Sequence, residues 1–232
     1  MSDGFQRWKD GIDRANGDWD AYDATIKEVV ATYNAHLLGN AWYPQLNWRV
    51  IKAMLWAETG PHDKDWQRRP MRIGVPNDPG LTVLLTRSEG SALVVPPTIF
   101  ITSDARTQPR QNIRAGVGYL LTRMANYDLA TVMDRDNRIF DVTVQPGDRG
   151  WESVARRCRS TSEVLLRLNP GHRYIHGGQV LKCQKASIQQ VITGWKAFDY
   201  RTIARRYNGN GEPKGDAKYA EKFDYAMRKI GK

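Results

Sequence analysis

The sequence is poor in the features that mark several classes of protein. No run of apolar residues approaches the length of about 18 that a membrane-spanning helix needs. The polar start, Met1–Asp10, lacks the apolar stretch of a signal peptide. Only two cysteines occur, 25 positions apart, so no CxxC redox or metal motif is present. We therefore expect a chain made in the cytoplasm without a signal peptide and without insertion into a membrane.

Acidic residues are also scarce relative to basic ones. The 25 Asp and Glu against 35 Lys and Arg give a net charge of +10 and indicate an anionic partner, such as nucleic acid, anionic lipid or bacterial cell wall. The basic residues form no stripe that alternates with aromatic residues, and no zinc-finger spacing occurs, so we do not expect a nucleic-acid partner. His172 and His176 lack the pattern of a metal motif. We expect neither a metal nor a cofactor.

The two cysteines, Cys158 and Cys183, lie in one short segment. A disulfide between them would close a loop worth roughly 3–4 kcal/mol in the chain-entropy model. It would also indicate an oxidising destination such as the periplasm. Two buried free thiols are the alternative, and an even pair confined to one small segment favours the bond.

A carboxylate at the end of an amphipathic helix is the most informative feature of the chain. Apolar residues at helical spacing predict a helix that begins after Asn47 as N-cap and ends at Gly60 as C-cap. Glu58 falls on its last turn, beside Trp56 and Ala57. Apolar neighbours and the negative end of the helix dipole disfavour the charged form. Both raise the pKa of Glu58, which suits a general acid near neutral pH.

The remaining patterns predict a mainly α protein of the α+β class. Residues 1–19 form a polar, loosely packed N-terminal extension. The segment 61–109 is rich in Pro, Gly and Asp and predicts a long functional loop. Helical spacing predicts further helices over residues 20–38, 111–127, 190–207 and 216–229.

The segment 139–186 has a different character from the helices around it. Its alternation and turn residues predict a strand–helix–helix–strand module. We expect strands over 139–144 and 179–183, and helices over 151–158 and 162–168 with Ser162 as a cap.

Several short patterns in this module point to one family. They are Val142-Thr143-Val144-Gln145-Pro146-Gly147-Asp148, Val154-Ala155, Leu165 to Asn169-Pro170, and Gly178-Gln179-Val180-Leu181. Together they resemble a LysM domain, which implies binding of glycans that contain N-acetylglucosamine, such as peptidoglycan. In that family the sugar lies between the turn after the first strand and the loop after the second helix. The glycan-binding residues that the resemblance implies are Gly147, Asp148, Arg149, Asn169 and Pro170.

Four further motifs occur in order along the flanking segments. They are Ala57-Glu58-Thr59-Gly60, Pro70-Met71-Arg72-Ile73-Gly74, Asn112 to Leu120, and Tyr207-Asn208-Gly209 followed by Tyr219. They resemble a lytic transglycosylase domain of the goose-type lysozyme superfamily, over about residues 20–130 and 188–230. The implied fold is a discontinuous lysozyme-like helical domain, residues 20–135 and 188–232, interrupted by the LysM-like module.

The resemblance implies that Glu58 cleaves the bond between N-acetylmuramic acid and N-acetylglucosamine. Glu58 protonates the glycosidic oxygen and then acts as base on the muramoyl 6-hydroxyl, which gives a 1,6-anhydro product. Arg72 stands where the family has Gln, and is a candidate contact for the muramoyl lactate or a peptide carboxylate. Tyr207 is expected to hydrogen-bond Glu58 or substrate, and Asn112 either contacts sugar or caps its helix. The implied substrate-binding residues are Thr59, Met71, Arg72, Asn112, Tyr119, Tyr207, Asn208 and Tyr219.

Two other functions stay open on the sequence. A hydrolytic lysozyme or phage endolysin would need a second carboxylate, about 6.5–9.5 Å from Glu58 in an inverting pair. The candidates are Asp63, Asp65 and Asp78. A cell-wall-binding protein without catalysis is the other alternative. For the enzyme, the resemblance suggests a type VI secretion effector that acts in the periplasm of a rival cell, with a cognate immunity protein and a secretion-apparatus carrier as partners.

Overall fold

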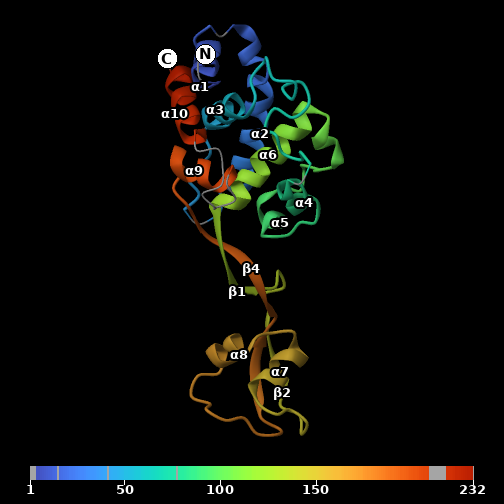
Figure 1. Cartoon of the computed structure of the whole chain (residues 1–232). Coiled ribbons are helices and arrows are strands. Elements are labelled where there is room, and N and C mark those ends of the chain that lie inside the picture. The colour runs from blue at the N-terminus through green and yellow to red at the C-terminus, as the bar shows by residue number, and fades with distance from the viewer. Residues whose placement is uncertain (1–3, 15, 41, 77, 209–217, 232) are drawn as a thin grey trace. The chain divides into compact units, whose positions relative to one another are not determined.

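The computed structural model describes residues 4–14, 16–40, 42–76, 78–208 and 218–231. Over these residues the chain is a mainly helical α+β protein with ten α-helices and two small antiparallel sheets of two strands each (Figure 1). The mainly helical α+β class predicted from the sequence is therefore confirmed. In the described part of the chain, no helix has both the length and the apolar character needed to cross a membrane.

The helices are α1 (Gly4–Asp13), α2 (Asp23–Leu37), α3 (Trp48–Glu58), α4 (Pro79–Leu85), α5 (Ser91–Val94), α6 (Pro109–Met124), α7 (Trp151–Cys158), α8 (Ser162–Leu168), α9 (Tyr200–Tyr207) and α10 (Tyr219–Ile230). Two short 3-10 helices are η1 (Gly17–Asp20) and η2 (Ser103–Arg106). The strands are β1 (Ala125–Met133), β2 (Ile139–Thr143), β3 (Val180–Gln184) and β4 (Ala186–Trp195). Strand β1 pairs with β4, and β2 pairs with β3.

The chain divides into two compact units. The helical unit consists of Met1–Asn126 and Ile192–Lys232, and the small unit is Tyr127–Val191. Both points of division fall within the paired strands β1 and β4. The predicted module, 139–186, lies within the small unit.

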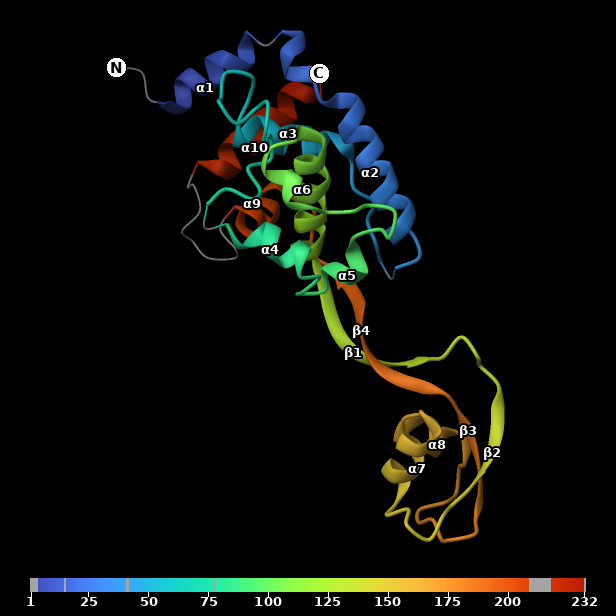
Figure 2. The same cartoon turned by 90° about the vertical axis from the view of Figure 1, so that its right-hand side faces the viewer.

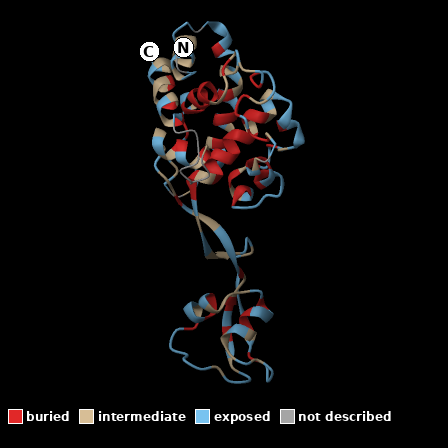
Figure 3. Cartoon of the chain, viewed as in Figure 1, coloured by how far each residue is buried: buried red, intermediate tan, exposed pale blue. Residues whose placement is uncertain are grey.

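Helices α3 and α6 carry much of the core of the helical unit (Figure 3). Every residue from Val50 to Ala57 is buried, and α6 packs against α2, α4, α5 and α9 (Figure 2). The predicted cap of α3 is confirmed, because Asn47 Oδ1 accepts the Arg49 amide at 3.0 Å. The helix ends at Glu58 and its C-cap is Thr59, not Gly60 as predicted; Gly60 follows the cap with a φ of +101°. A Cβ at Gly60 would lie 2.8 Å from the Trp19 ring, so both conformation and space require glycine there.

The small unit has its own apolar core between the β2–β3 sheet and helices α7 and α8. In the antiparallel register, Val142 faces Leu181. The predicted bounds of α7 and α8 are confirmed. The cap of α8 differs from the prediction: Thr161 Oγ1 accepts the Val164 amide at 3.3 Å, whereas Ser162 is the first residue of the helix. The core consists of Val144, Val154, Ala155, Cys158, Leu165, Leu181 and Cys183.

The favoured disulfide between the two cysteines is wrong for this structure. Cys158 and Cys183 are free thiols, both buried in the core of the small unit. Burial, with the neighbouring Cys183, raises the pKa of the Cys158 thiol to about 11. The alternative of two buried thiols is what the structure contains, and both act as small apolar core residues.

Two expectations about the first half of the helical unit were also wrong. The described residues of the segment 1–19 are not a loose extension, because residues 4–13 form α1, residues 17–19 belong to η1, and Ile12 and Trp19 are buried. Trp8 Nε1 donates to the Trp56 carbonyl at 3.0 Å, which ties α1 to α3. The segment 61–109 is not a continuous loop, because it contains α4, α5 and η2. Asp78 and Pro79 supply the cap and first residue of α4, a local start signal within a Pro- and Gly-rich stretch.

The helix predicted over 190–207 is only half present. Residues up to Trp195 belong to β4, and α9 begins at Tyr200. The β1–β4 pairing was not predicted, and it replaces the end of the helix expected over 111–127. The two strands lie about sixty residues apart in the sequence, so helical spacing within either segment gave no sign of the partner.

Candidate active site

Glu58 opens onto a cavity of about 250 Å³ in the helical unit. The lining side chains come from segments that are far apart in the sequence: the end of α3, the turn that follows it, the start of α4, and helices α6 and α9. Besides Glu58, the lining residues are Met71, Arg72, Ile73, Val75, Asp78, Tyr119, Tyr207 and Asn208.

The carboxyl group of Glu58 is poised to exchange a proton near neutral pH. Burial raises its pKa from the ordinary 4.5 to about 7. Hydrogen bonds from Tyr219 and Asn208, and the positive charges of Arg72 and Lys222, act in the opposite direction but do not outweigh the burial. The group therefore has comparable populations of its protonated and ionised forms near pH 7. It can give a proton in one step and accept one in the next.

A buried asparagine holds the wall of the cavity opposite the helix end. Asn112 is fully buried on α6, with Oδ1 accepting the Met71 amide at 2.9 Å. Its Nδ2 donates to the carbonyls of Ile73 at 2.9 Å and Ala105 at 2.6 Å. The side chain neither lines the cavity nor caps α6, whose N-cap is Gln108. Asn112 thus fixes the Met71–Ile73 segment from behind and does not face a ligand in the cavity.

Met71 is fixed from two further directions. A Cβ at Gly116 would lie only 2.4 Å from Met71 Sδ, so the glycine makes room for this side chain against α6. The Tyr207 hydroxyl donates to the Met71 carbonyl at 2.9 Å, and its ring meets Tyr119 edge-on with centroids 5.8 Å apart. The Tyr207 hydroxyl is therefore directed at the backbone, while Tyr119 and Tyr207 both contribute to the cavity wall.

Thr59 and Tyr219 support Glu58 without lining the cavity. Thr59 Oγ1 donates to the Pro70 carbonyl at 2.9 Å, which ties the end of α3 to the segment that carries Met71. Tyr219 is buried on α10 and hydrogen-bonds the Glu58 carboxyl group. Of the residues predicted to bind substrate, the structure places Met71, Arg72, Tyr119, Tyr207 and Asn208 at the cavity. Gly209, which belongs to the motif with Tyr207 and Asn208, lies outside the described residues.

Two wall residues were not among the predicted site residues. Ile73 lies inside the motif that supplied Met71 and Arg72, so its position next to them was a usable signal. Val75 follows this motif and gave no signal of its own.

The three candidate second carboxylates occupy different environments. Asp78 lines the cavity, and its two oxygens accept the amides of Gly80 at 2.9 Å and Gly74 at 2.6 Å. Asp63 does not line it and pairs with Arg72 at 2.5 Å. Asp65 is buried away from the cavity against Arg69 and Arg68. Only Asp78 shares the cavity with Glu58 among these three, and it also shapes the turn that starts α4.

The acid Asp65 is held in its ionised form by its partners. Burial alone disfavours the charge, but the hydrogen bonds and charges of Arg69 and Arg68 outweigh it and lower the pKa of Asp65. This carboxylate therefore serves an ion pair within the turn after α3, at 2.8 Å from Arg69.

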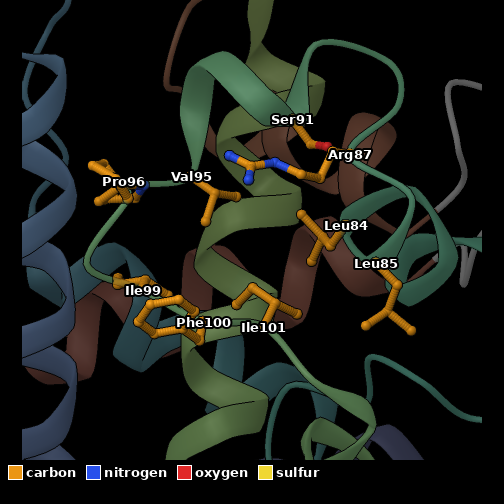
Figure 4. A pocket seen from close by; sticks show the side chains of 10 residues that line it. Leu84, Leu85, Arg87, Ser91, Val95, Pro96, Ile99, Phe100 and Ile101 are labelled. Carbon is orange, nitrogen blue, oxygen red and sulfur yellow. The ribbon is translucent and has the colours of Figure 1, made fainter.

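A second pocket of about 150 Å³ in the helical unit is lined mainly by apolar residues. In Figure 4 the Arg87 side chain extends toward Val95, and Leu84, Phe100 and Ile101 are among the other lining side chains. No carboxyl, imidazole or thiol group lines it. It therefore lacks the groups for acid–base chemistry that the Glu58 cavity has.

In the small unit, two predicted glycan-binding residues, Asp148 and Asn169, are engaged by other residues of that unit. Asp148 pairs with Arg157 at 2.6 Å and accepts the Gln145 amide at 2.8 Å. Asn169 accepts the Lys182 amide at 2.8 Å, and its Nδ2 donates to the carbonyls of Lys182 and Leu165. The other three predicted residues, Gly147, Arg149 and Pro170, are exposed.

An open hollow of about 650 Å³ in the small unit lies along the loop before β3. It is lined by Gly171, His172, Arg173, Tyr174, His176, Gly177 and Gln179. The loop after the second helix, which was predicted as one wall of a glycan groove, thus contributes residues to this hollow. The turn at Gly147–Gly150 does not.

Within the described ranges, no group of three or more His, Cys, Asp or Glu side chains is arranged to hold a metal ion. Comparisons of the chain with models of protein families, with curated proteins and with solved structures found no significant match.

Proposed function

We propose that the protein cleaves peptidoglycan as a lytic transglycosylase, with Glu58 as its single acid and base. The observation that carries this proposal is the pKa of about 7 for a carboxyl group that opens onto a cavity. Cleavage of a glycosidic bond requires a proton donor for the leaving oxygen. An ordinary Glu is ionised at neutral pH, whereas Glu58 still carries its proton in a large share of molecules.

The same group serves both halves of the proposed reaction. Protonated Glu58 gives its proton to the glycosidic oxygen as the bond between that oxygen and the muramoyl C1 breaks. The carboxylate that results then takes the proton of the muramoyl 6-hydroxyl, whose oxygen forms the new bond to C1. The product is a 1,6-anhydro sugar, no water is consumed, and Glu58 ends protonated. Hydrogen bonds from Tyr219 and Asn208 stabilise the carboxylate between the two steps.

The convergence of separate motifs on one cavity supports this reading. Met71 and Arg72 come from one predicted motif, Tyr119 from a second and Tyr207 with Asn208 from a third, and all line the cavity with Glu58. We accordingly infer a lysozyme-like fold for the helical unit and a LysM-like, glycan-binding role for the small unit. Within the small unit, the hollow along residues 171–179 is the surface to which we assign glycan contact.

A hydrolytic lysozyme is the second candidate, and one observation favours it. Asp78 lines the same cavity as Glu58 and is a candidate to activate water. Both of its oxygens accept backbone amides, so Asp78 is already used in shaping the start of α4. An Asp78→Asn change would abolish cleavage by a hydrolase that needs this base. In a transglycosylase it would act only through the local turn.

The test of the proposed function is digestion of purified peptidoglycan sacculi. Glu58→Gln keeps the size of the side chain but removes its proton chemistry, and should lower the release of soluble fragments by about 100- to 10,000-fold. Glu28→Gln is the matched control, because Glu28 is an exposed carboxylate of α2 that pairs with Arg110 and does not line the cavity. Equal release by the wild type and Glu58→Gln would contradict the proposal. Binding without any release would favour a protein that only binds cell wall.

We also propose that the enzyme is an antibacterial effector delivered to the periplasm of a rival cell, where the net charge of +10 would favour contact with an anionic cell wall. A cognate immunity protein that covers the Glu58 cavity and a secretion-apparatus carrier would be its partners. Wild-type protein directed to the periplasm should lyse cells, and the Glu58→Gln variant should not. Unchanged growth with the wild type would count against this role.

A further inference from the structure

Arg72 has an unfavourable backbone conformation at the wall of the Glu58 cavity. Its φ is +51°, in the left-handed region that residues with a Cβ rarely adopt. Both neighbours are fixed: Asn112 binds the Met71 amide and the Ile73 carbonyl, and the Arg72 amide donates to the Arg69 carbonyl at 2.8 Å. Glycine would adopt this conformation without strain. A strained arginine held from both sides indicates that its side chain has a use, because such strain persists mainly at functional sites.

The guanidinium group of Arg72 is both restrained and accessible. It pairs through Nη2 with Asp63 at 2.5 Å, and the side chain is 43% exposed. Asp63 is itself held, because its Oδ1 accepts the Asp65 amide at 2.8 Å. Arginine has five N–H donors, so this single ion pair leaves donors for a ligand. Among the described residues that line the cavity, Arg72 is the only one with a positive charge.

We propose that Arg72 determines specificity by binding a carboxylate carried by the glycan, and that Asp63 positions it for this contact. The inference rests on the proposed function of the Glu58 cavity and names the class of glycan, an anionic one, that the cavity prefers. Arginine binds carboxylates through paired N–H donors, which a neutral side chain cannot reproduce. Polymers of N-acetylglucosamine have no carboxylate. Muramoyl glycans carry one on the lactyl group when it is free, or on the stem peptide when the lactyl group is amidated.

In this proposal Asp63 positions Arg72 and is not a second catalytic carboxylate. As a second catalytic carboxylate it would have to face the cavity, which it does not line. Its pairing with Arg72 instead limits the orientations of a long, flexible side chain. A guanidinium fixed in advance loses less conformational freedom when it binds a ligand. Loss of Asp63 should therefore weaken the same preference as loss of Arg72, but by less.

Binding measured by calorimetry in the Glu58→Gln background tests this inference independently of cleavage. The three probes are a hexamer of N-acetylglucosamine, peptide-free muramoyl glycan with free lactyl carboxylates, and muramoyl glycan with intact stem peptides. We expect at least one carboxylate-bearing probe to bind about tenfold or more tightly than the hexamer. The one that does so identifies the lactyl group or the peptide as the source. Adding Arg72→Gln should remove the preference, Arg72→Lys should keep part of it, and Asp63→Asn should reduce it.

Arg72→Gly separates recognition from folding. This variant removes the side chain and the backbone strain together, so its Tm should equal or exceed that of the parent while the preference is lost. An unchanged preference in Arg72→Gln, or equal binding of all three probes by the parent, would overturn the inference. The proposed function fails separately, if the wild type releases no fragments from sacculi although Arg72-dependent binding persists.

Discussion

Two buried asparagines, one in each unit, have the same structural role. Asn112 in the helical unit and Asn169 in the small unit each accept one backbone amide and donate to two carbonyls. Both were candidates for contact with sugar, since both lie in motifs that resemble those of glycan-active families, and helix capping was the alternative for Asn112. In the structure each one instead fixes the backbone that surrounds it.

The consequences of this shared role differ between the units. Asn112 fixes a segment whose next side chain, Arg72, faces a cavity that also contains Glu58. Asn169 fixes the end of α8 to β3 at Lys182, whose side chain pairs with Asp141 at the surface. The comparison shows that a residue that stands out in a sequence motif can have a purely structural role. In the helical unit, the side chain that faces the cavity is then that of Arg72, which lies between the residues that Asn112 binds.

The largest effect is expected for Asn112→Ala. The change leaves the Met71 amide and two carbonyls without partners in a buried position, which should lower the free energy of unfolding by about 3–5 kcal/mol. It should also impair fragment release by the molecules that remain folded, because the Met71–Ile73 wall is no longer held. Urea unfolding and sacculus digestion measure the two effects. If the Asn112→Ala variant were as stable as the wild type, these hydrogen bonds would not hold the wall.

A somewhat smaller loss is expected for Asn169→Ala. Its partners lie nearer the surface, so we expect a loss of about 2–4 kcal/mol. Fragment release from short soluble glycans should fall less than in Asn112→Ala, because Asn169 supports no wall of the Glu58 cavity. An equal or larger fall would mean that Asn169 matters for cleavage at least as much as Asn112. The distinction drawn between the units would then be wrong.

The pH dependence of stability should reveal the buried carboxyl group of the helical unit. Between pH 4.5 and about 7, folded Glu58 keeps its proton while the unfolded chain releases it. Its contribution to stability is therefore complete below pH 4.5, is lost as the pH rises to about 7, and is constant above that. The loss is on the order of 3 kcal/mol. Glu58→Gln lacks this titration, so its stability relative to wild type should rise across this window. A constant difference would contradict the raised pKa.

The smallest effect concerns Tyr219. Its hydrogen bond lowers the pKa of Glu58, so Tyr219→Phe should raise that pKa further. The high-pH limb of activity, where the acid form is lost, should move upward by up to about one pH unit. A pH–rate profile on sacculi measures this shift. A limb that stays in place, or moves to lower pH, would mean that Tyr219 does not stabilise the carboxylate.

The sequence predicted the elements whose signals are local. The bounds of α7 and α8 and the Asn47 cap of α3 follow from short-range spacing and capping chemistry. The motifs also supplied most residues of the cavity, because each motif carries its own wall residue. The motifs do not indicate which of their side chains are buried in the core and which line the cavity, so the burial of Asn112 was not predicted.

The features that were missed depend on partners distant in the sequence. Strands β1 and β4 are stable only as a pair, and neither segment indicates the other. Arg72 has a positive φ, and the residues on both sides of it are hydrogen-bonded by Asn112, which lies forty residues later in the chain. Local propensity would not place an arginine in that conformation.

Mass spectrometry of the muropeptides that the wild-type protein releases from sacculi tests the central claim most directly. If Glu58 acts alone as acid and base, the products carry 1,6-anhydro ends and are lighter by one water molecule than muropeptides with reducing ends. Products with reducing ends would contradict this mechanism. They would mean that water enters the reaction and that a second carboxylate, with Asp78 as the one in the cavity, activates it.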